Sequence, residues 1–242
     1  MQNFSQYTPD HSQQNSMLAG ISSEAVYFQR IYSWMFAALG VTAAVATLLV
    51  ITGMWSLFNG GMIWMVVAFA PLGLALYMNS RAESLSVGSL KICLMVFASL
   101  FGITLSVLFQ FYPTVAFIKA FVTTAGVYGA MAAYGLVTKR SLQGIGSFMY
   151  MGVWGLIIAS VVNFFWHNNM LDLTICVIGV LIFAALTAYD HQKLRVIYFQ
   201  YQRDGAAAEY VSKGVIFGAL TLYLDFINLF LFLLRLFGRG ND

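Results

Sequence analysis

Seven long apolar runs alternate with short polar or charged stretches along most of the chain. Each run is close to the ~20 residues that an α-helix needs to cross the hydrocarbon core of a bilayer. The pattern therefore predicts an all-α polytopic membrane protein with seven transmembrane helices. We expect Pro71 to kink the second and shortest run, and Pro113 to mark a tight turn between the third and fourth. The runs cover Ile31–Gly53, Met62–Met78, Ile92–Tyr112, Val115–Val137, Ile145–Trp166, Leu171–Tyr189 and Val215–Leu234.

The N-terminal segment is different in character, being polar and rich in Gln, Ser and Asn. It has no basic start and no apolar core, so it is not expected to be a cleaved signal peptide. We predict a flexible tail over residues 1–24 and one membrane domain over residues 25–238. The first membrane helix should then serve as its own insertion signal.

Composition supports the membrane class and excludes others. Hydrophobic residues make up 60 % of the 242 residues and charged residues only 9 %, whereas soluble domains carry about 25 % charged residues. The net charge of +3 and the lack of a basic-aromatic patch argue against a nucleic-acid partner. Cys93 and Cys176 lie singly inside apolar runs, which favours buried thiols over a disulfide or metal site.

The positive charges predict an orientation. Lys119, Arg235 and Arg239 would lie on one side of the membrane if every run spans it, and the remaining nine on the other. The richer side should be cytoplasmic, which places the N-terminus inside. Arg235 and Arg239 fit this rule only if the seventh run dips into the membrane and returns, but its length and continuity favour a full span. The nine are Arg30, Arg81, Lys91, Lys139, Arg140, Lys193, Arg195, Arg203 and Lys213.

The seventh run carries a carboxylate, Asp225, at its middle. A charge there costs about 2.5–3.5 kcal/mol on insertion scales, so it is rarely left facing lipid. At about 100° per residue, the small and polar side chains of this run fall within one arc, and bulky apolar residues cover the rest. We therefore expect an inner helix whose small, polar face lines a site or pathway. That face comprises Gly214, Gly218, Thr221, Asp225, Asn228 and Arg235.

Asp190 closes the sixth run and is the second acidic residue of interest. Taken alone, Asp190 is as consistent with an interfacial charge beside Lys193 as with a functional site residue. A cytoplasmic loop of about 25 residues would make the sixth and seventh helices antiparallel neighbours, yet would leave Asp190 and Asp225 about 10–15 Å apart in depth if both are straight. If the two carboxyl groups do meet, they cannot easily both ionise, and the pair can share a proton, bind Ca²⁺ through its oxygens, or exchange one for the other.

Three further residues are weaker candidates for the same site. Arg81 is either a snorkelling cytoplasmic anchor or a basic partner of the acidic pair. His191 is either an exposed loop histidine or a group that tunes the pH response. Asn228 lies one turn from Asp225 and should form interhelical hydrogen bonds. At the opposite surface, His167 and Asp172 are expected to be solvated loop residues.

Three blocks of sequence carry a family resemblance: Ala133–Gly135 with Thr138–Leu142, Leu186–Lys193, and Gly218–Phe230. They resemble the Bax inhibitor-1 family, and the likeness extends over about residues 25–238, closest to its bacterial inner-membrane branch. The resemblance implies six helices around a central seventh and a pH-sensitive calcium leak, with Asp190 and Asp225 as a proton-sharing latch near the cytoplasmic side. Calcium and protons would then be its ligands, with no resident cofactor. Ser141 and His191 depart from the common family residues, and the second run lacks an acid present in some members.

Two other classes of function compete with a channel. An intramembrane aspartyl protease would carry Gly-x-Gly-Asp before its second acid and a Pro-Ala-Leu segment after it; Asp225 follows Leu222-Tyr223-Leu224 and no Pro-Ala-Leu occurs. The zinc motif His-Glu-x-x-His is also absent, so we do not expect an enzyme. The remaining alternative is an interaction protein that regulates a membrane protease or a stress response without ion flux, with the polar tail as a docking segment.

Overall fold

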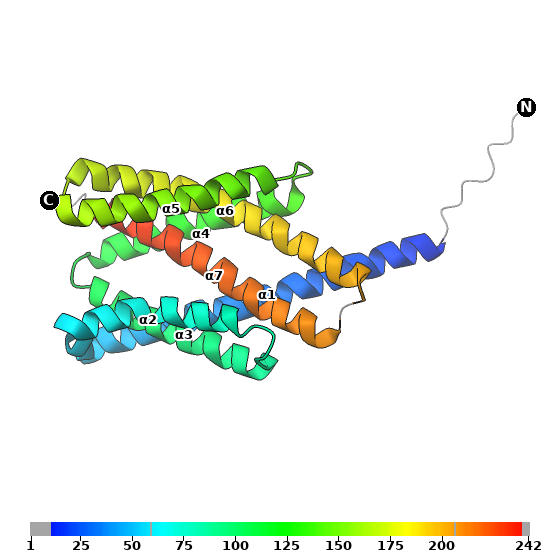
Figure 1. The fold of residues 1–242 in the computed structure, drawn as a ribbon, viewed down its shortest axis with the longest axis horizontal. Coiled ribbons are helices and arrows are strands. Elements are labelled where there is room, and N and C mark those ends of the chain that lie inside the picture. The colour runs from blue at the N-terminus through cyan, green and yellow to red at the C-terminus, as the bar shows by residue number, and fades with distance from the viewer. Residues whose placement is uncertain (1–10, 59, 206, 239–242) are drawn as a thin grey trace, which may run out of the picture.

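Helices form almost all of the computed structural model, which describes residues 11–58, 60–205 and 207–238 and contains no strand in those ranges (Figure 1). Six of the helices are long and apolar enough to cross a membrane, and α2 supplies a shorter apolar helix, Met65–Ser80. The predicted seven-helix polytopic architecture is therefore confirmed. The elements are α1 (His11–Thr52), the short 3₁₀ helix η1 (Met54–Phe58), α2 (Gly61–Ser80), α3 (Val87–Leu108), α4 (Thr114–Val137), α5 (Gln143–Trp166), α6 (Asn169–Arg203) and α7 (Ala208–Gly238).

Local sequence explains several helix boundaries. Pro113 is the N-cap of α4, as expected from the predicted turn. The Ser86 hydroxyl accepts a hydrogen bond from the Ser89 amide at the start of α3, and the Asn168 side chain accepts two at the start of α6. Pro71 lies inside α2, which continues through it.

The last helix is the centre of the bundle, as the family resemblance implied. Figure 1 shows α7 running obliquely between α1, α2 and α3 on one side and α4, α5 and α6 on the other. It packs against α1, α3, α4 and α6. In its most apolar stretch 67 % of residues are buried, against 11–44 % in the other membrane-spanning helices. Away from α7, the two groups meet where α1 touches α6 and where the Tyr128 hydroxyl of α4 donates to Met35 Sδ of α1 at 3.4 Å.

The predicted loop of about 25 residues between the last two helices is wrong. Helix α6 continues to Arg203 and α7 begins at Ala208. The apolar run ends at Tyr189, but His191, Leu194 and Tyr198 are buried beyond it at helical spacing. One buried stripe on an otherwise polar segment is therefore enough to continue the helix.

The N-terminal segment also departs from expectation where it is described. Helix α1 begins at His11, so residues 11–24 are helical where a flexible tail was predicted, and they extend away from the bundle (Figure 1). Residues 1–10 lie outside the described residues. Glu24 forms an ion pair with Arg195 of α6 at 2.9 Å.

Helix α7 does not dip and return. It is continuous over 31 residues, about 46 Å at 1.5 Å per residue, which exceeds the ~30 Å hydrocarbon core. Near its end Arg235 forms an ion pair with Asp172, in the first turn of α6. Asp172 is therefore not the solvated loop residue that the sequence predicted. Because the Asp172 carboxylate neutralises Arg235, the positive charge of Arg235 on this side of the membrane argues only weakly against a full span.

Candidate functional site

The carboxyl groups of Asp190 in α6 and Asp225 in α7 lie close enough to interact with each other. Both residues are buried, with 2 % and 5 % of their surfaces exposed. An ionised carboxylate only accepts hydrogen bonds, so a hydrogen bond between two carboxyl groups would require a proton on one of them. The structure therefore brings together the two acids singled out from the sequence, in an arrangement suited to holding a shared proton.

The extension of both helices makes this contact possible. Asp190 lies 13 residues before Arg203, where α6 ends, and Asp225 lies 17 residues after Ala208, where α7 begins. Because the two helices are antiparallel and joined by a short connection, the two aspartates differ in depth by only four residues, or about 6 Å. This is well below the depth difference of about 10–15 Å expected from the sequence, and two aspartate side chains can bridge it where the helices cross.

Close approach of α4 and α5 to α6 fixes the position of Asp190. Gly135 of α4 faces the backbone of Ala188, where a Cβ atom would collide with the carbonyl oxygen. Gly146 of α5 lies against the ring of Tyr189 in the same way. The residues just before Asp190 are therefore held on two sides by glycines that admit no larger side chain.

Gln192 ties the loop between α4 and α5 to the same part of α6. Its side-chain oxygen accepts a hydrogen bond from the Leu142 amide, and its nitrogen donates to the Arg140 carbonyl oxygen, both at 2.8 Å. Arg140 and Leu142 belong to the first of the sequence blocks and Gln192 to the second. The two blocks are thus in contact, next to Asp190.

A cavity of about 370 Å³ leads to Asp190 from the end of the bundle where α6 and α7 are connected. Gly214, Gly218 and Thr221 of α7 form part of its wall. These three residues belong to the small, polar face of α7, so part of that face borders the cavity. Lys193, which sequence reasoning treated only as a neighbour of Asp190, lines the same cavity as Asp190.

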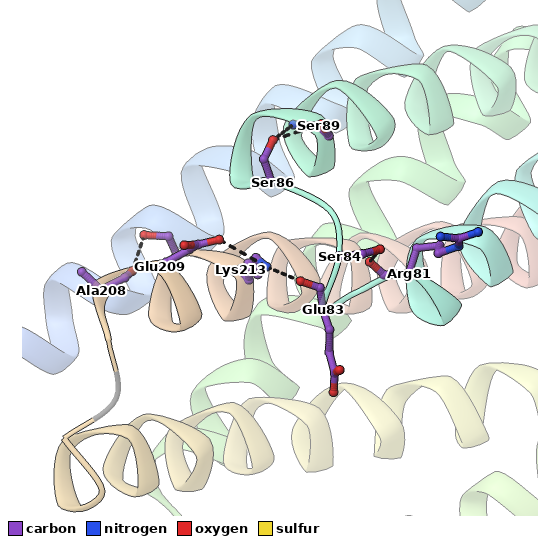
Figure 2. A network of polar contacts seen from close by, with 9 residues as sticks. Arg81, Glu83, Ser84, Ser86, Ser89, Ala208, Glu209 and Lys213 are labelled. Atoms are coloured by element: carbon purple, nitrogen blue, oxygen red, sulfur yellow. Dashed lines mark hydrogen bonds and ion pairs between the residues drawn. The ribbon is translucent and has the colours of Figure 1, made fainter.

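Ala82 and Glu83, in the loop between α2 and α3, also line this cavity. The Lys213 ammonium of α7 donates to the Glu83 carbonyl oxygen of this loop at 2.8 Å and pairs with Glu209 at 3.3 Å. Figure 2 shows Lys213 between the two, reaching from α7 to the loop. Nothing in the sequence pattern linked Lys213 to a segment 130 residues away.

His191 is not an exposed loop residue; that prediction is wrong. It is completely buried in α6, with its ring about 5.6–5.9 Å from the rings of Tyr32 and Tyr128. Its Nδ1 lies 2.6 Å from the Thr187 carbonyl oxygen, which can only accept, so Nδ1 carries a proton. Nε2 is buried without a hydrogen-bond partner. His191 therefore fills the space between α1, α4 and α6 directly beside Asp190.

The other two candidate residues, Arg81 and Asn228, do not lie at the pair of carboxyl groups. Arg81 is exposed at the C-terminal end of α2, and its guanidinium points away from the loop in Figure 2, as a surface anchor would. Asn228 lines a separate crevice of about 530 Å³ together with Leu224 and Phe232. By contrast, the Tyr150 hydroxyl, which no sequence pattern marked, donates to Asp190 Oδ1 at 3.4 Å.

The donor set is relevant to calcium. Within residues 11–58, 60–205 and 207–238, no group of three or more His, Cys, Asp or Glu side chains could hold a metal ion. The pair supplies carboxylate oxygens, and Asp225 Oδ2 is buried without a hydrogen-bond partner. Calcium usually takes six to eight oxygen ligands. Two carboxyl groups alone supply fewer oxygen ligands than that.

Comparison with known proteins agrees with the sequence blocks. The profile of the family described as "Inhibitor of apoptosis-promoting Bax1" matches residues 24–242. The chain is 40 % identical over 215 residues to the inner membrane protein YbhL of Escherichia coli, covering 88 % of this chain and 91 % of that protein. It is 38 % identical to protein RP147 of Rickettsia prowazekii over 89 % of this chain and 90 % of the relative. A Deinococcus radiodurans protein is also 38 % identical, over 89 % of this chain and 91 % of that protein.

Proposed function

The chain belongs to the Bax inhibitor-1 family of membrane proteins, and from that premise we propose that it is a pH-sensitive calcium leak channel gated by Asp190 and Asp225. The name of the E. coli relative supports a location in the bacterial inner membrane. The charge pattern supports a cytoplasmic N-terminus, with the cavity that leads to Asp190 opening on the same side. The family is not a known enzyme family, which agrees with the lack of protease motifs.

The observation that carries this proposal is the pair of buried, interacting carboxyl groups, of which Asp190 lines a cavity. While the pair holds a proton, the shared hydrogen bond joins α6 to α7. When the last proton leaves, two negative charges face each other in a medium of low dielectric and repel strongly. Separation of α7 from α6 at this point would open a path past the pair, and an entering cation would compensate the exposed charge.

The packing beyond the pair agrees with a closed state. On the far side of Asp225, the side chains of Leu229, Leu233 and Leu234 on α7 are 0–4 % exposed. A hydrated cation has no polar ligands among such side chains, so this half of α7 must move for ions to pass. In this account the cavity and pair form the entrance, and the leucine-packed half of α7 forms the barrier.

A calcium-flux assay on purified protein in liposomes tests the proposal. Asp190→Asn should remove the dependence of the flux on pH, because only one titrating carboxyl group then remains at the contact. Asp204→Asn is the matched control, since Asp204 is exposed and pairs only with its neighbour Arg203 among the described side chains. Equal pH profiles in the two variants would contradict a gate at Asp190.

A second function, regulation of another membrane protein, is favoured by the projecting start of α1. The helix extends away from the bundle over its first turns (Figure 1), where it could contact a partner such as a membrane protease. In that case the carboxyl pair would serve packing alone. Folded protein that carries no calcium at any pH would favour this function, and deletion of residues 1–20 would then abolish co-purification of the partner.

A further inference from the structure

A narrow apolar crevice lies between α1 and α4, on the side of α7 opposite to the crevice that contains Asn228. Its volume is about 320 Å³. Its floor includes Phe226, Ile227 and Phe230 of α7, of which only 3–6 % is exposed. The crevice thus reaches the central helix from the lipid-facing side of the bundle.

The crevice exists because the backbones of α1 and α4 stay apart, although the Tyr128 hydroxyl of α4 donates a hydrogen bond to Met35 Sδ of α1 outside the crevice lining. Each packs against α7, and otherwise α1 packs mainly on α3 and α4 on α6; no Cα atoms of α1 and α4 come within 8 Å. Ala43 and Thr47 of α1 and Ile118 and Phe121 of α4 line the crevice and are exposed. The rim therefore faces the bilayer, while the floor is the buried surface of α7.

The length of the crevice along α1 and α4 fits within the hydrocarbon thickness of one leaflet. The lining extends from Leu39 to Thr47 along α1, about 12 Å, and from Thr114 to Phe121 along α4, about 10 Å. Half of the hydrocarbon core is about 15 Å thick. Thr114 begins α4, so the crevice runs from near the membrane boundary inward to Phe226, the neighbour of Asp225.

We propose that this crevice binds one acyl chain of a membrane phospholipid. Water is a poor occupant because the lining is apolar apart from threonine hydroxyls, and the Thr42 hydroxyl is already bonded to the Ala98 carbonyl oxygen and the Tyr223 hydroxyl. A helix of a second protein, about 10 Å across, is too wide for this volume. An empty crevice would forfeit the dispersion contacts of its aromatic floor, which a flexible hydrocarbon chain supplies.

The bound chain would touch the central helix next to the carboxyl pair. The Phe226 ring contacts the rings of Tyr128 and Phe121 on α4, with centroids 5.5 and 5.9 Å apart. The crevice therefore gives the bilayer a direct contact with the part of α7 that carries Asp225. This site does not depend on whether the protein conducts calcium.

Photo-crosslinking in liposomes tests the site with the full chain. The probe is a phospholipid with a diazirine in the middle of one acyl chain, and the labelled residues are found by peptide mass spectrometry. We expect adducts on Phe226, Ile227 or Phe230, which lipid cannot reach unless a chain enters the crevice. Ala43→Phe should abolish these adducts by filling the crevice from its rim. Ala44→Phe should retain them, because Ala44 is exposed but does not line the crevice.

Three results would overturn the proposal. One is labelling of the rim residues Ile118 and Phe121 without any adduct on α7. Another is equal labelling of α7 in Ala43→Phe and Ala44→Phe. If Ala43→Phe does not fold, Phe121→Ala replaces it: widening the mouth should increase labelling of α7, and unchanged or lower labelling would contradict the site.

Discussion

Asp190 and Asp225 bring their carboxyl groups together from two antiparallel helices, each residue well inside its helix and far from the connection between them. The contact depends on neighbours from other parts of the chain. Gly135 and Gly146 allow α4 and α5 to approach α6 beside Asp190, and Gln192 fastens the preceding loop to it. The carboxyl pair is therefore the point at which three separate sequence blocks converge.

Gly135→Ala should destabilise the protein. The new methyl group would collide with the Ala188 carbonyl oxygen, and overpacking of this kind costs about 1–3 kcal/mol. Thermal unfolding in detergent measures the effect. Gly129→Ala in the same helix is the control, since nothing lies within 4 Å of its Cβ position. Equal unfolding temperatures for the two variants would show that α4 does not need this close approach.

Arg235→Met should also lower stability, at the opposite end of α7. It leaves Asp172 with 18 % side-chain exposure and without its cation, and loss of a hydrogen bond to a charged group costs about 1.5–3 kcal/mol. The exposed pair Arg203–Asp204 gives the comparison: Asp204→Asn should change stability by about 0–1 kcal/mol. If both variants unfold alike, the Arg235 contact does not secure the end of α7.

Lys213→Met should loosen the loop between α2 and α3. The Lys213 side chain is only 12 % exposed, and its ammonium group holds this loop through the Glu83 carbonyl oxygen. Hydrogen exchange over residues 82–86 should become faster than in the wild type. Lys139→Met, at an exposed lysine outside this network, should leave it unchanged. Unaltered exchange in Lys213→Met would mean that the loop is held by other contacts.

His191→Gln separates packing from pH sensing. Glutamine can still donate to the Thr187 carbonyl oxygen but does not titrate. If the two aspartates alone sense pH, the variant should keep the pH dependence of calcium flux, with lower stability from lost packing against Tyr32 and Tyr128. A displaced midpoint of the flux–pH curve would instead make His191 part of the sensor.

The number of helices and the central carboxylate were predictable from the sequence because both depend on local pattern. A run of apolar residues marks a membrane helix, and Asp225 is conspicuous within one. The meeting of Asp190 with Asp225 was not predictable from spacing. The apolar run stops at Tyr189, and the helix continues only because His191, Leu194 and Tyr198 are buried against other helices. Only the family resemblance indicated the contact in advance.

Contacts between side chains on different helices were also not predictable from the sequence. Asp172 and Arg235 are 63 residues apart and Lys213 and Glu83 are 130 apart. Each charged residue alone is as consistent with a solvated surface as with a contact. Tyr150 sits in an apolar run whose composition gives no reason to single out one tyrosine. Such contacts are set by how helices pack, which periodicity within one helix does not specify.

The most direct test of the central claim is calcium flux into liposomes containing the purified protein, measured at acidic, neutral and alkaline pH for the wild type and Asp225→Asn. In the wild type, flux should rise with pH as the shared proton is lost and the two carboxylates repel. In Asp225→Asn the amide can donate to Asp190 at every pH, so flux should stay low and flat. A folded Asp225→Asn variant with the wild-type pH profile would contradict the latch.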